Sequence, residues 1–240
     1  MMRTLLALLL LVQCCSAPQH TGVAGGGSAP TVISKVNTQE ANATSGTSLS
    51  TAGASVMTGN ALVVGCAVVA ASAPTITVSD TAGNTFSPVG SELAWNSSGN
   101  FTEMFAALNV TGNANDAITC NFSASVSYPG LVAVQYSGVA TSGAIDVTNA
   151  TGQCSNCTSV TSSSFTTAQA KEVIVALYNA NNTATFSPGT GFTVEVQAGG
   201  TSNSGFALGD EITSAVQSGV TTSVSWGTSL PGAILVGSLK

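Results

Sequence analysis

Five carboxylates that lie on or beside predicted strands are the groups with the most potential for chemistry: Glu92, Glu103, Glu195, Asp210 and Glu211. Two carboxyl groups suffice for glycoside hydrolysis, with a separation of about 5 Å for retention and a larger one for inversion. The sequence lacks the Glu-x-Asp-x-Glu strand found in some glucanases, and it has only two Trp to stack on sugars. We interpret the five acids as solvated carboxylates that protect sheet edges. Catalysis of glycoside hydrolysis is the alternative interpretation.

Other catalytic chemistry is limited by the shortage of bases and cations. The one histidine, His20, precedes a Gly-rich segment, which excludes a Ser-His-Asp arrangement held in a folded site. Beyond Arg3 the chain has no Arg and three Lys, at positions 35, 171 and 240. So few cations cannot neutralise phosphates, so we expect no nucleic-acid partner.

Four cysteines follow the apolar leader, at positions 66, 120, 154 and 157. An even number in an oxidising compartment indicates two disulfides with three possible connectivities. We favour Cys66 with Cys120, because both lie in strand-like runs that could be neighbours, and Cys154 with Cys157 as a local clip in a predicted loop over residues 151–158. This spacing also occurs in zinc and redox sites, but no second Cys pair, His or helix N-terminus supports either.

A run of turn residues over positions 80–84 predicts a hairpin loop, because Asp and Asn bond to nearby backbone and Gly supplies positive φ. Asp80 and Asn84 could alternatively join Asp146 or Asp210 around Ca²⁺, which takes six to eight oxygens. The run does not have the spacing of a dedicated calcium loop. The sequence therefore predicts no cofactor, with Ca²⁺ as the alternative.

The first residues are typical of a secretory signal peptide, which we assign to residues 1–17. Its apolar run is too short to span a bilayer, so we predict no membrane insertion. Residues 18–30 form a flexible Gly-rich segment, and residues 31–240 a single domain. We expect a secreted protein at or outside the cell surface.

Short apolar or alternating runs separated by Gly, Asn, Asp, Ser and Pro predict an antiparallel all-β protein. So many strands favour a two-sheet β-sandwich, most simply a jelly roll. The predicted strands cover residues 32–36, 61–70, 75–79, 86–88, 101–108, 117–123, 131–136, 145–147, 164–167, 172–178, 192–197, 205–212, 221–226 and 232–239.

Several motifs occur in the order of a known family: GNALVV at 59–64, TVSDTAGNTF at 77–86, QYSGV at 135–139, IDVT at 145–148, GTGF at 189–192 and the final Leu-Lys. Over residues 59–240 the chain resembles an uncharacterised family of secreted bacterial β-sandwich surface modules. The resemblance implies a jelly-roll-like domain on extracellular proteins and supplies no catalytic residues. The chain differs from the bacterial modules in its cysteines and in its many glycosylation motifs. These two features make a eukaryotic secretory protein the alternative.

Asn-x-Ser/Thr motifs mark candidate glycosylation sites at Asn42, Asn96, Asn100, Asn109, Asn149, Asn156 and Asn181. An eighth motif, at Asn121, lies inside a predicted strand. Ser/Thr/Asn-rich turns also generate such motifs as a by-product.

Aromatic rings beside amides are the candidates for glycan binding, since they can stack on sugar faces. We select Trp95, which precedes a polar loop, and Tyr128; Tyr136, Tyr178 and Trp226 could serve equally as core. Low charge and a flexible N-terminal segment favour self-association through sheet edges. The sequence thus predicts a non-enzymatic structural or adhesive β-sandwich, with a carbohydrate-binding module as the alternative.

Overall fold

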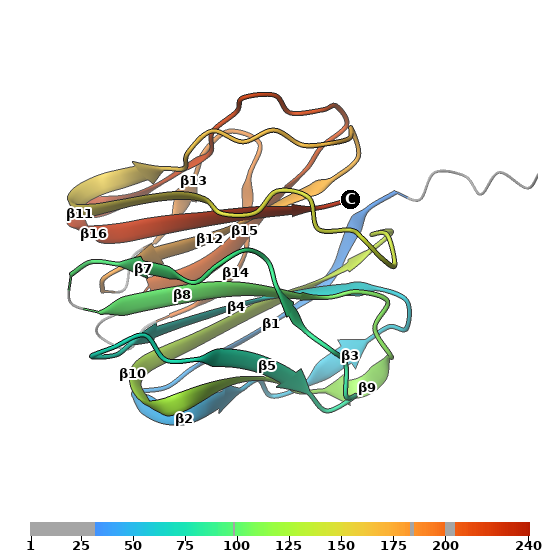
Figure 1. Ribbon diagram of the computed structural model, residues 1–240, viewed down its shortest axis with the longest axis horizontal. Helices are drawn as coiled ribbons and strands as arrows, with labels where there is room; N and C mark the ends of the chain where they lie inside the picture. The colour runs from blue at the N-terminus through green and yellow to red at the C-terminus, as the bar shows by residue number, and fades with distance from the viewer. Residues whose placement is uncertain (1–31, 98, 183–184, 200–204) are drawn as a thin grey trace, which may run out of the picture. The chain divides into compact units, whose positions relative to one another are not determined.

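The structure is a computed structural model that describes residues 32–97, 99–182, 185–199 and 205–240. The predicted signal peptide, the Gly-rich segment and His20 lie outside the described residues. Within those ranges the chain folds into antiparallel sheets (Figure 1), which confirms the predicted all-β sandwich. No helix in the described ranges is long and apolar enough to cross a membrane.

The first sheet has the central order β1-β10-β4-β8-β6 and carries three further strands at its margins. Its strands are β1 (Ser34–Asn42), β2 (Ser45–Ser50), β4 (Ala61–Val69), β5 (Ile76–Asp80), β6 (Ser87–Pro88), β7 (Leu93–Trp95), β8 (Asn100–Ala107) and β10 (Ile118–Ser137). A small sheet pairs β3 (Ala54–Val56) with β9 (Asn113–Asp116).

The second sheet has the order β11-β16-β12-β15-β14, with β13 paired to β16. Its strands are β11 (Ala150–Thr161), β12 (Val173–Ala180), β13 (Ser187–Pro188), β14 (Thr193–Ala198), β15 (Gly205–Ile212) and β16 (Ser223–Leu239).

Each sheet is therefore built from one half of the chain, and the two halves repeat one strand plan. A long strand, β10 or β16, lies between an edge strand and a buried apolar strand, β4 or β12. The sequence repeats Thr-Phe-Ser-Pro at 85–88 and 185–188, and Pro-Gly inside the long strand at 129–130 and 231–232. In this respect the chain order differs from that of a jelly roll, whose sheets exchange strands.

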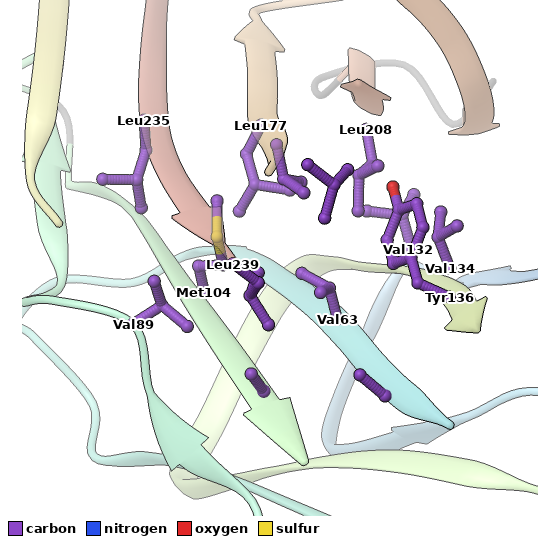
Figure 2. Packing of buried hydrophobic residues seen from close by; sticks show 14 of the residues in the cluster. Val63, Val89, Met104, Val132, Val134, Tyr136, Leu177, Leu208, Leu235 and Leu239 are labelled. Carbon is purple, nitrogen blue, oxygen red and sulfur yellow. The ribbon is translucent and has the colours of Figure 1, made fainter. Parts of the chain in front are cut away.

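The core has three parts. The central cluster lies between the two sheets and includes Val63 and Met104 facing Leu177, Leu208 and Leu235 (Figure 2). A second cluster lies on the other face of the first sheet, and a third on the other face of the second sheet. Covered on both faces, β4 and β12 are buried along nearly their whole length, which explains their continuous apolar sequence.

The long strands produce this layering because they change direction part-way along. The first part of β10 pairs with β2 and β5, and the part from Gly130 onward pairs with β1 and β4. Between them the register shifts beside Tyr128, whose φ is +49°, and Pro129, which cannot donate to a ladder. Figure 1 shows the first part, with β2 and β5, as a layer below β4 and β8.

Several sequence expectations were wrong in detail. Residues 151–158, predicted as a loop, lie in β11, because the long β16 offers its edge to a polar partner. Predicted strands 145–147 and 164–167 contribute only the isolated bridges at Ile145 and Phe165. The predictions 117–123 and 131–136 are one strand, as are 221–226 and 232–239, because Pro-Gly bends these strands without ending them.

Candidate functional site

Trp95 lies at the end of β7 with its ring inside the sandwich, where it is 6% exposed. Its indole Nε1 donates to Thr102 Oγ1 at 3.2 Å, and that hydroxyl donates to Asn179 Oδ1 of the second sheet at 2.9 Å. The chain of bonds ties the two sheets together. A ring held in this way has little surface left for a sugar to stack on.

A cavity of about 310 Å³ opens beside this ring. Amide side chains from both halves of the chain line it, namely Asn96, Asn100 and Gln153, together with Phe101. Asn100 is buried and donates to Asn181 Oδ1 at 2.7 Å. Tyr128, the other predicted ligand-binding residue, lies half-buried at the β10 bend and is not among the lining residues, so the structure does not join the two aromatics into one site.

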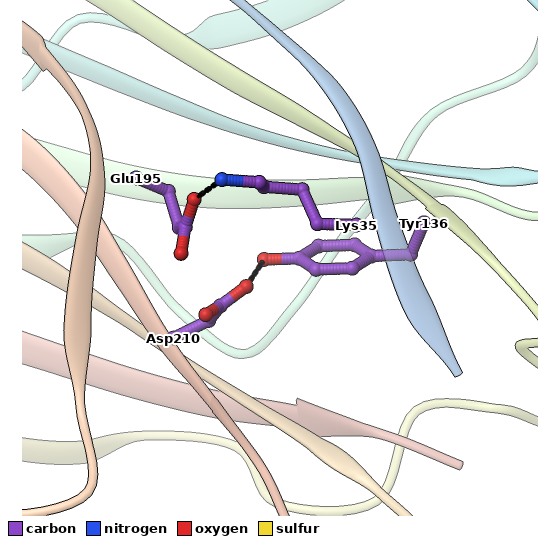
Figure 3. A network of polar contacts seen from close by, with 4 residues as sticks. All are labelled: Lys35, Tyr136, Glu195 and Asp210. Atoms are coloured by element: carbon purple, nitrogen blue, oxygen red, sulfur yellow. Dashed lines mark hydrogen bonds and ion pairs between the residues drawn. The ribbon is translucent and has the colours of Figure 1, made fainter. Parts of the chain in front are cut away.

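A network of ionisable groups crosses the gap between the sheets (Figure 3). Tyr136 of β10 donates its hydroxyl to Asp210 Oδ2 of β15 at 2.6 Å, and Lys35 of β1 forms an ion pair with Glu195 of β14. Burial raises the pKa of Asp210, while the bond from Tyr136 and the nearby positive charge of Lys35 lower it. Glu195 and Asp210 were candidate carboxylates, but their sequence positions gave no signal of Lys35 or Tyr136 as partners.

Glu92, which directly precedes β7, and Glu103 of β8 are a second pair of candidate carboxylates that lie near each other. Burial raises the pKa of Glu103 to about 7, and repulsion from Glu92 contributes. Glu211 is apart from them on β15, and burial raises its pKa also. Neither Glu92 nor Glu103 lines the Trp95 cavity, and none of its described lining residues is a carboxylate.

Asp80 and Asn84 meet in the turn after β5, which is not the predicted hairpin, because β5 pairs with β10 and the next strand, β6, pairs with β8. The Asp80 carboxylate accepts from the Asn84 backbone N–H at 2.8 Å and from its Nδ2 at 2.7 Å. The next acid is Asp116, whose Oδ1 accepts from the Thr81 hydroxyl. Asp146 and Asp210 are bonded elsewhere, to Ala168 N and Tyr136, so the loop does not gather the calcium ligands considered from the sequence. Among the described residues no group of three or more His, Cys, Asp or Glu side chains could hold a metal ion.

Both predicted disulfides are present. Cys66 of β4 is joined to Cys120 of β10, and Cys154 to Cys157 within β11. The first bond connects the two layers that enclose the second core cluster. The second stands at a register irregularity of an edge strand, which is a local clip but not in a loop.

The candidate glycosylation sites differ in exposure. Asn42, Asn109, Asn149 and Asn156 are exposed, whereas Asn96 and Asn181 are half-buried. Asn100 is 3% exposed and its nitrogen is bonded to Asn181, so the atom that would carry a glycan faces the interior. The alternation of β8 turns this side chain inward, which the sequence motif alone does not reveal.

Comparison of the chain with protein-family models, curated proteins and solved structures finds no match.

Proposed function

We propose that this chain is a secreted, non-enzymatic β-sandwich that acts outside the cell in a structural or adhesive role. The proposal rests on one observation: the few ionisable side chains of the protein bond to groups on other strands. Tyr136 and Asp210 bond across the sheets, Lys35 pairs with Glu195, and Glu172 accepts from the Ser238 hydroxyl at 2.6 Å. These groups hold strands together, and such a protein acts through its surface.

The edge strand β11 supplies a surface suited to assembly. It spans twelve residues with no Lys or Pro, and most of its side chains are half-buried or exposed. Such an edge presents unpaired backbone groups that can pair with another strand. Two disulfides are consistent with an extracellular setting. Self-association through β11 therefore agrees with a structural role.

Glycan binding is the second candidate, because the cavity beside Trp95 is lined by three amide side chains that could bond sugar hydroxyls. A glycan array and size-exclusion chromatography of the same preparation separate the two functions. Large assemblies without sugar binding support the structural role. Saturable sugar binding that is lost in Gln153→Ala supports the carbohydrate-binding module. Turnover of a polysaccharide that is lost in Glu103→Gln would overturn both.

A further inference from the structure

Two edge strands from opposite sheets are bulged where they face each other. On β1 the pairing with β10 shifts register directly after Lys35. On β14 the extra residue of the bulge is Glu195, which falls between the register pairs of Val194 and Val196. Because a bulge redirects a side chain, these two irregularities bring Lys35 Nζ and Glu195 Oε2 into direct contact (Figure 3).

The contact lies at the boundary between the interior and solvent: its carboxyl is buried and its amine is exposed. The Glu195 side chain is only 8% exposed, and that of Lys35 is 42% exposed. Asp210 is 6% exposed, lies close enough for the Lys35 charge to lower its pKa, and is held by the Tyr136 hydroxyl. Figure 3 shows the Asp210 carboxyl and the Lys35–Glu195 contact both at the hydroxyl end of the Tyr136 ring. A lysine, a carboxyl acceptor and a second carboxyl thus meet between the sheets.

We propose that Lys35 and Glu195 become joined by an intramolecular amide bond, with Asp210 as the proton relay. A proton first passes from Nζ to Glu195 Oε2 within the ion pair, and the nitrogen then attacks Cδ of the protonated carboxyl. A C–N bond forms, the bond from Cδ to its hydroxyl oxygen breaks, and one water leaves. Asp210 takes the proton lost by the nitrogen and returns it to the departing hydroxyl, so no oxidant or further reactant is required.

Amide formation between a free amine and a free carboxylic acid is slow. Two physical effects favour the reaction within this fold. The fold holds amine and carboxyl together, and intramolecular placement is equivalent to an effective concentration of about 10⁵–10⁸ M. The amide also replaces a partly buried ion pair, whose desolvation opposes folding, by a neutral group. The bond would join the edge strand of the first sheet to the edge strand of the second.

Trypsin provides a sharp test, because beyond Arg3 the chain offers it only Lys35 and Lys171 as internal cleavage sites. All four cysteines of the two disulfides lie between these sites, so neither disulfide connects the fragments on the two sides of Lys171. After denaturation, reduction and digestion, an amide bond keeps residues 172–240 attached to the N-terminal part and blocks cleavage after Lys35. The linked product is lighter than its two parts by one water. Separate fragments with an unmodified Lys35 and Glu195 would overturn the proposal.

Substitutions at Lys35, Glu195 and Asp210 distinguish the two joined residues from the proton relay. Lys35→Arg and Glu195→Ala should abolish the link, while Glu195→Gln should still form it, with loss of ammonia in place of water. Asp210→Asn should slow linkage although both joined residues remain, and Asp210→Glu should restore part of the rate. Circular dichroism checks that each variant is folded. Equal linkage in wild type and Asp210→Asn would rule out the relay.

Discussion

Tyr136 of the first sheet and Asp210 of the second are joined across the sandwich by a hydrogen bond of 2.6 Å in which the phenol donates. Tyr178, also fully buried, has a hydroxyl that finds no hydrogen-bond partner among the described residues. Two tyrosines of similar burial thus differ in whether their hydroxyl stabilises the fold.

This contrast predicts opposite results for the same substitution. Tyr136→Phe leaves a buried carboxyl without its donor, so we expect it to lower the free energy of unfolding by about 1.5–3 kcal/mol. Tyr178→Phe removes an unpartnered hydroxyl and should be neutral or stabilising. Urea unfolding of both variants measures the difference, and equal destabilisation would contradict the assignment.

The raised pKa of Glu103 predicts that the stability of the fold depends on pH. Burial and the neighbouring Glu92 raise its pKa from 4.5 to about 7, so the folded chain binds this proton more tightly than the unfolded chain. The resulting stabilisation is fully present below about pH 4.5 and is lost as the pH rises through about 7. Thermal unfolding from pH 4 to 8 should show a decline in Tm that flattens in Glu103→Gln. Glu40→Gln makes the same change of charge at an exposed position, and an equal flattening there would contradict the assignment to Glu103.

The two disulfides should contribute unequally. Cys66–Cys120 closes a chain separation of 54 residues, whereas Cys154–Cys157 closes one of 3. The chain-entropy model gives about 4 kcal/mol for the long loop and about 1.5 kcal/mol for the short one. Urea unfolding of the two Cys→Ala double variants measures both values. A larger loss from removing the short bridge would show that loop closure does not govern stability here.

At Gly65 the two sheets approach so closely that a Cβ atom has no room. A Cβ atom at this position of β4 would lie 2.6 Å from Leu177 Cδ2 and 2.8 Å from Phe206 Cζ, both of which face it across the central core. Gly65→Ala should therefore destabilise the fold by about 1–3 kcal/mol through overpacking. Gly227→Ala is the matched control, since nothing lies within 4 Å of its added Cβ. Equal Tm values for the two variants would contradict this packing.

The fold class was predictable because it follows from local pattern, as does the bridge between Cys154 and Cys157, which are three residues apart. Continuous apolar runs marked β4 and β12, and Cys66 and Cys120 occurred in strand-like segments. The polar strand β11 was missed, since its residues have low strand propensity and it forms by pairing with β16. The bends at Pro129 and Pro231 likewise look like strand ends in the local sequence, because Pro-Gly is a turn signal.

The site was less predictable than the fold. Trp95 precedes a polar loop, yet its ring is buried, because the bonds through Thr102 to Asn179 join residues distant in sequence. The ion pair of Lys35 with Glu195 spans 160 residues, and two bulges that no local pattern marked bring it together.

Assembly through the β11 edge tests the central claim most directly. Thr158 is exposed on this strand, and a Lys there should oppose pairing with another edge. Thr141→Lys adds the same charge at an exposed turn and should leave assembly unchanged. The measurement is light scattering across a concentration series. We predict that wild type and Thr141→Lys form species larger than a monomer, and that Thr158→Lys shifts them towards the monomer; a wild-type chain that stays monomeric at every concentration would contradict the structural role.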